Sequence, residues 1–129
     1  MKRDMDLVRE LLLRLEALPI RRGGIVHIPA TADEISVPGH DVAEIEYHLS
    51  QLVKAGFIDE GGLRPSEGIG FRSLTWEGHD FLDSVRDPKV WAKTKSGALA
   101  AGGFTVDLLK DLAKGFVKKQ IEERTGVQL

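Results

Sequence analysis

The stretch IEYHLSQLVKAGFI, residues 45–58, decides the expected fold. It belongs to a longer segment, residues 41–55, whose apolar side chains recur at helical spacing. Asp41 is placed to cap the first turn, and Gly56 stands where a left-handed residue commonly ends a helix. The stretch therefore predicts an amphipathic helix that turns at once into a strand beginning at Phe57. The predicted apolar face of the helix consists of Val42, Ile45, Leu49, Leu52 and Val53.

The residues before this helix predict a second helix and a strand. Over residues 4–18, Asp4 is a suitable N-cap and Pro19 stops the helix. Residues 24–28 (GIVHI) are rich in β-branched side chains and predict a short strand. Residues 30–37 are compatible with either a short helix or another strand. The apolar face of the first helix consists of Met5, Val8, Leu12, Leu15 and Leu18.

The residues after Gly56 predict a β-hairpin and a further helix. Residues 57–63 and 69–75 are the two expected strands, joined by the Gly/Pro-rich turn GGLRPSEG. Thr75 can cap a helix that runs to about Val85. We expect Trp76, Phe81, Leu82 and Val85 to be its packing residues. The order of elements predicts an α+β fold, with a winged helix-turn-helix-like core over residues 1–86.

Residues 87–129 are expected to form a C-terminal helical extension for oligomerisation or docking. Pro88 opens a helix to Trp91, residues 96–103 (SGALAAGG) read as a flexible or closely packed joint, and a last helix covers about 105–125. The apolar side of the last helix is wider than one core requires. It can pack on its own domain, on a second copy or on a partner. A membrane-surface helix is the weaker alternative, because carboxylates dilute its lysine ridge. The residues expected to bind a partner or a second copy are Leu108, Leu109, Leu112, Phe116 and Val117.

Three stretches resemble the DUF2513 family. They are MKRDMDLVRELLL at the start, EIEYHLSQLVKAGFID in the centre and SLTWEGHDFLDSVRDPKVWAKTK over residues 73–95. Members of that family are small proteins of bacteria and their phages with a winged-helix-like core and no established activity. The resemblance thus implies a bacterial protein of phage or mobile-element type, and it supplies no catalytic residues.

The composition excludes several classes of protein. Without cysteine, there are no disulfides and no thiolate ligands. No stretch approaches the roughly 18–20 apolar residues of a membrane span. The charged N-terminus is unlike a signal peptide, so a cytoplasmic protein is expected. Charge is divided unevenly: residues 23–84 carry three basic and eleven acidic side chains, whereas residues 85–129 carry nine basic and five acidic ones.

The outward face of the central helix carries side chains that suit base edges and phosphates. The acidic surroundings oppose this use, because duplex binding depends on neutralising phosphates. DNA is therefore one candidate ligand, and a protein partner or a second copy is the other. The candidate nucleic-acid or partner-binding residues are Tyr47, His48, Ser50, Gln51 and Lys54 on the helix, with Arg64 and Arg72 on the hairpin.

No motif indicates an enzyme. His40, Glu44 and His48 recur every four residues, but His40 precedes the helix, so the metal-binding pair one turn apart is missing. There is no nucleophile elbow, and GGLRPSEG lacks the Lys-Ser/Thr and helix of a phosphate cradle. We expect no metal, no cofactor and no small-molecule substrate. The sequence predicts a non-catalytic winged-helix regulatory protein, for which DNA is one candidate ligand. The alternative is a protein-interaction module that uses an acidic surface and the C-terminal helix.

Overall fold

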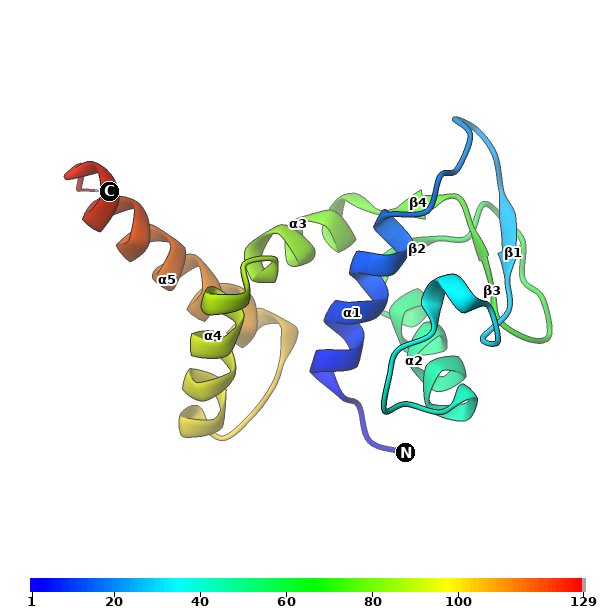
Figure 1. Cartoon of the computed structure of the whole chain (residues 1–129), viewed down its shortest axis with the longest axis horizontal. Coiled ribbons are helices and arrows are strands. Elements are labelled where there is room, and N and C mark those ends of the chain that lie inside the picture. Colours follow the sequence, from blue (N-terminus) through cyan, green and yellow to red (C-terminus); the bar gives the residue numbers. More distant parts are fainter. Residues whose placement is uncertain (129) are drawn as a thin grey trace. The chain divides into compact units, whose positions relative to one another are not determined.

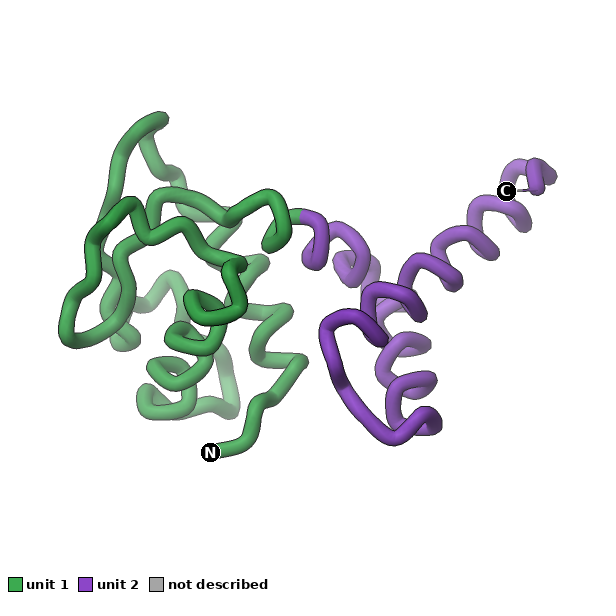
Figure 2. Tube along the Cα trace, turned by 180° about the vertical axis from the view of Figure 1, so that it is seen from behind, with its two compact units in different colours: residues 1–79 green, residues 80–129 purple. Residues whose placement is uncertain are grey.

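The computed structural model describes residues 1–128, which form five α-helices, one 3-10 helix and four short strands (Figure 1). The mixture of helices and small antiparallel sheets confirms the expected α+β class. The chain divides into two compact units, Met1–His79 and Asp80–Leu129 (Figure 2). The division falls inside helix α3 (Trp76–Val85), whereas the sequence placed the boundary just beyond the end of that helix.

Helix α1 (Met5–Glu16) lies at the centre of the first unit and contacts α2, strand β4 and the 3-10 helix. The Asp4 carboxylate caps it by accepting from the N–H groups of Asp6 and Leu7, as the sequence predicted. The buried side is wider than predicted. It consists of Met5, Leu7, Val8, Leu11, Leu12 and Leu15.

The 24–37 region forms strand β1 (Val26–Ile28) and the 3-10 helix η1 (Asp33–Ile35). This outcome resolves the ambiguity left by residues 30–37 in favour of a short helical turn. Ile35 is fully buried and contributes to the core at the side of α1. The turn is therefore held by one apolar side chain rather than by a long helical face.

Helix α2 (Val42–Lys54) has both predicted ends. Asp41 accepts from the Glu44 N–H at 2.8 Å, and the Glu44 side chain accepts from the Asp41 N–H, which completes a capping box. Gly56 follows with φ of 77°, the left-handed conformation that the sequence expected there. The buried residues of the helix are Ile45, His48, Leu49 and Leu52, while Val42 is 49% exposed. The prediction for Val42 was wrong.

The strands form two antiparallel pairs that share one stretch of chain. Strand β2 (Ile58–Asp59) pairs with β4 (Ser73–Leu74), as the hairpin prediction required. Strand β3 (Ile69–Phe71) instead pairs with β1, with Val26 opposite Phe71. Only Arg72 separates β3 from β4, so the second arm of the hairpin pairs first with β1 and then with β2. The 60–68 loop connects the arms.

The second unit contains a pair of packed helices, α4 (Pro88–Ala101) and α5 (Val106–Thr125). Asp87 caps α4, Gly102 ends it in the left-handed region, and Thr105 caps α5. Residues 96–103, expected to be a flexible or closely packed joint, are mostly helix. Their alanines favour helix, and their small side chains let α5 approach closely. A Cβ on Gly97 would lie 3.3 Å from a Leu112 methyl, which shows how closely the helices pack.

Candidate interaction surface

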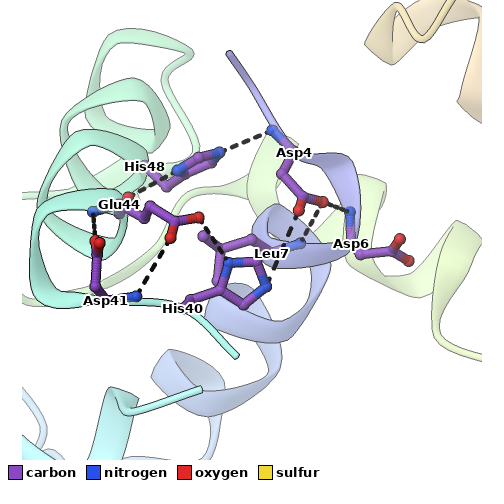
Figure 3. A network of polar contacts seen from close by, with 7 residues as sticks. All are labelled: Asp4, Asp6, Leu7, His40, Asp41, Glu44 and His48. Atoms are coloured by element: carbon purple, nitrogen blue, oxygen red, sulfur yellow. Dashed lines mark hydrogen bonds and ion pairs between the residues drawn. The ribbon is translucent and has the colours of Figure 1, made fainter. Parts of the chain in front are cut away.

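A polar network ties the first turn of α1 to the first turns of α2 (Figure 3). The Asp4 N–H donates to His48 Nε2 at 2.8 Å, and His48 Nδ1 lies 2.8 Å from the Glu44 carbonyl. A peptide N–H only donates and a carbonyl only accepts. His48 is therefore the neutral tautomer with its proton on Nδ1. His48 is 1% exposed, so the prediction that it lies on the outward face of the helix was wrong.

The same network accounts for the other residues of the i, i+4, i+8 pattern. His40 Nδ1 lies 3.0 Å from a Glu44 carboxylate oxygen, and its Nε2 lies 4.0 Å from Asp4. The carboxylates of Asp4 and Glu44 also cap α1 and α2. Both ring nitrogens of His48 are already hydrogen-bonded to the backbone. Within residues 1–128, no group of three His, Asp or Glu side chains is arranged to hold a metal. These residues act as a connection between helices.

Three of the predicted contact residues line one groove of ≈ 420 Å³ between α2 and the 60–68 loop. Ser50 and Lys54 come from α2, and Arg64 comes from the loop. The loop is fixed at its far end because the Gly68 N–H donates to both carboxylate oxygens of Glu46, each at 3.0 Å. We call this the α2 groove. Tyr47 and Gln51 are part-exposed on α2 and do not line it.

Arg64 in the 60–68 loop and Arg72 between β3 and β4 each have an acidic neighbour. Arg64 Nε lies 3.7 Å from a Glu60 carboxylate oxygen, and Arg72 Nη1 lies 3.6 Å from Asp59. In both pairs the arginine is solvent-exposed, so each pair contributes little to stability. Their local effect is to reduce the positive charge that a phosphate would meet. Lys54 is exposed and forms no ion pair with another residue among 1–128.

Trp76 is the functional candidate that the sequence prediction missed. We expected it to pack in the core, but the side chain is 85% exposed at the start of α3. The Thr75 hydroxyl accepts from the Gly78 N–H at 3.0 Å and donates to the Gly56 carbonyl, which fixes where the helix begins. At roughly 100° per residue, Trp76 lies on the opposite side of the helix from buried Val85. A helical-wheel count would have revealed this exposure.

The exposed indole lines a second groove, which we call the Trp76 groove. Its volume is ≈ 590 Å³. Strand β2 and residues 73–75 form its walls, and Glu60 and Arg64 lie on the loop side. Glu60 and Arg64 line both this groove and the α2 groove. The start of the 60–68 loop is therefore a polar ridge between two open concave surfaces of the first unit.

The C-terminal residues predicted to bind a partner belong to α5 and are only partly available. Leu109 is fully buried within its own chain. Packing on its own domain was one of the alternatives that the wide apolar face left open. The other four, Leu108, Leu112, Phe116 and Val117, are half-buried. Lys110 donates to Asp80 at 2.9 Å, and this contact holds the pKa of Asp80 below its usual value. Because α5 packs on α4 of its own chain, self-association through α5 stays a prediction.

Comparison with known proteins identifies the family. Among residues 1–128, no helix combines the length and apolar character of a membrane span. The chain matches no solved structure. An uncharacterized protein of Haemophilus influenzae is 31% identical over 125 residues, which cover 94% of this chain and 99% of that protein. The family model described as "Hypothetical protein (DUF2513)" matches residues 2–104. The chain therefore belongs to the DUF2513 family.

Proposed function

We propose that this protein is a non-catalytic winged-helix regulatory protein that acts as a protein-interaction module. The order α1, β1, η1, α2, β2 and β3–β4 supports a winged-helix plan, in which α2 would be the recognition helix and the 60–68 loop would be the wing. Pairing of β3–β4 with both β1 and β2 supports the same plan. A fold alone does not determine a function, so the function is inferred from the chemistry of the surface residues.

The exposure of Trp76 is the main observation that supports a protein-interaction function. A tryptophan can bury a large apolar area on binding, and it is enriched among the residues that dominate interface energies. In this chain the indole is 85% exposed at the edge of a ≈ 590 Å³ groove. The neighbouring polar side chains of Asp59 and Arg64 can form the rim that surrounds such an apolar anchor. This arrangement suits a protein partner.

Photo-crosslinking at position 76 tests the proposal in cells that produce the protein naturally. We expect a benzophenone side chain there to capture a discrete protein, and the adduct should be lost on proteinase treatment but not on nuclease treatment. The same probe at Leu99, which is 67% exposed in the other unit, is the control. Adducts that are removed by nuclease, or an identical pattern at both positions, would contradict the proposal.

Duplex DNA is the second candidate, favoured by the convergence of Ser50, Lys54 and Arg64 in the α2 groove. If the α2 face reads DNA, Gln51→Ala should relax sequence preference, since glutamine can pair with adenine. Lys54→Ala should weaken binding to all sequences and reduce the salt slope by about one unit. Fluorescence anisotropy with specific and random duplexes measures both effects.

The charge of the first unit limits this second candidate. Arg64 and Arg72 are paired with carboxylates, so binding to random duplex is expected to be no tighter than a Kd of ~10⁻⁴–10⁻⁶ M. Tight binding to random duplex in moderate salt would contradict that electrostatic argument. It would also make DNA, rather than a protein, the preferred ligand of the α2 face.

A further inference from the structure

We propose that a groove between α4 and α5 binds single-stranded nucleic acid. The groove has a volume of ≈ 340 Å³ and lies within the second unit, separate from the residues of the Trp76 groove. Lys89 and Lys93 line it from the first two turns of α4. Phe116, Lys119 and Arg124 line it from α5. This site is independent of the protein-interaction surface on the first unit.

The charge of the groove is strongly positive. Four cations face one carboxylate in its lining, that of Glu123. Lys89, Lys93, Lys119 and Arg124 form no ion pair with another residue in the described part of the chain, unlike Arg64 and Arg72 in the first unit. Side chains four residues apart on a helix are neighbours, so Lys89 and Lys93 present two ammonium groups side by side.

Asp87 is the other nearby carboxylate, and it is already used. Its oxygen accepts from the N–H groups of Lys89 and Val90, which caps α4. Those hydrogen bonds hold the pKa of Asp87 below its usual value, and the charges of Lys89 and Arg124 lower that pKa further. The carboxylate therefore remains at the cap, and the ammonium groups on the groove side are left to an anionic ligand.

Phe116 and Gln120 favour single-stranded nucleic acid over other anionic ligands, such as duplex DNA or an acidic peptide. Phe116 is half-buried and lines the groove beside the cations. Proteins that bind single strands combine a basic groove with an aromatic face on which unpaired bases stack. Bases of a duplex are already stacked on one another and offer no free face, and an acidic peptide has no base to offer. The Gln120 amide lines the same groove and can both donate to and accept from a base edge.

Fluorescence anisotropy of the full-length protein with a labelled oligothymidylate of about 15 nucleotides tests the inference. Each neutralised phosphate contributes about −0.7 to the slope of log K against log salt, so four cations predict a slope of about −3. The double variant Lys93→Gln, Lys119→Gln should show about half that slope. Phe116→Leu keeps an apolar side chain without a ring, and it should weaken binding about 5- to 100-fold at unchanged salt slope.

The matched control is Lys114→Gln, Lys118→Gln, which removes two exposed lysines of the same helix that do not line the groove. The control should retain most of the affinity, and circular dichroism should show every variant folded. If the Phe116→Leu protein does not fold, the inference is tested by comparing the groove pair (Lys93 and Lys119) with the control pair (Lys114 and Lys118). These four lysines lie on the surface, so their substitution should leave the protein folded. Equal losses in groove and control variants would overturn the inference. So would an absence of binding at about 50 mM salt, or an oligoglutamate peptide that competes as well as unlabelled oligothymidylate.

Discussion

Leu52→Ala is expected to lower the free energy of unfolding of the first unit by about 2–5 kcal/mol. Leu52 is 2% exposed on the face of α2 that is turned toward the core, and α2 packs against α1. Removing the side chain loses its burial and leaves a cavity that rigid neighbours fill only partly. Leu12 and Leu49, both fully buried, are core residues of those two helices. Urea denaturation followed by circular dichroism measures the change.

Val53→Ala is the matched control for this prediction. Val53 is adjacent in sequence but only half-buried, and it lines the α2 groove instead of the core. Its truncation should cost clearly less than that of Leu52, because less apolar area returns to water. Equal midpoints and equal slopes for the Leu52 variant and the parent would show that this face of α2 does not form part of the cooperative core.

The elements that the sequence predicted well are those with local signals. Asp4, Asp41 and Thr75 cap α1, α2 and α3 as expected, because a cap depends only on the next few backbone N–H groups. Gly56 likewise adopts the left-handed conformation at the end of α2. The family resemblance is confirmed over residues 2–104. Local chemistry and a matching motif were enough for these conclusions.

The wrong predictions concern side chains that were placed on the wrong side of their helix. His48 was placed on the outward face of α2, but its ring is buried and accepts a hydrogen bond from the backbone N–H of Asp4. Trp76 was assigned to the core because it is apolar, although its helical position faces solvent. Residue type misled only in the case of Trp76. Similarly, pairing of β3 with β1 depended on a long-range register that no local pattern reports.

The candidate surfaces were only partly foreseeable for the same reason. Charge counts along the chain showed an acidic centre and a basic C-terminal segment. They did not show that Arg64 and Arg72 are neutralised by neighbouring carboxylates. Nor did they show that Lys93 and Lys119 converge on one groove. Recognising these arrangements requires the positions of side chains from different elements, whereas charge counts give only the net charge of a segment.

A pair of glycine substitutions should change stability in opposite directions. Gly78 lies in the first turn of α3, and a Cβ at this position would stand only 2.3 Å from the Phe57 carbonyl oxygen. That oxygen accepts from the Thr75 N–H, so it is held by the backbone and has little freedom to move away. Gly78→Ala must therefore displace α3 from Phe57, and we expect a loss of about 1–3 kcal/mol or more.

Gly115→Ala is the opposite case, on the exposed side of α5. An added Cβ has no neighbour within 4 Å, and the backbone at Gly115 is helical. Alanine restricts the unfolded chain and favours helix, so a gain of about 0.4–1 kcal/mol is expected. Thermal and urea denaturation of both variants against the parent measure the two effects. A Gly78→Ala protein as stable as Gly115→Ala would mean that α3 does not begin in close contact with Phe57, and that Thr75 does not fix its start.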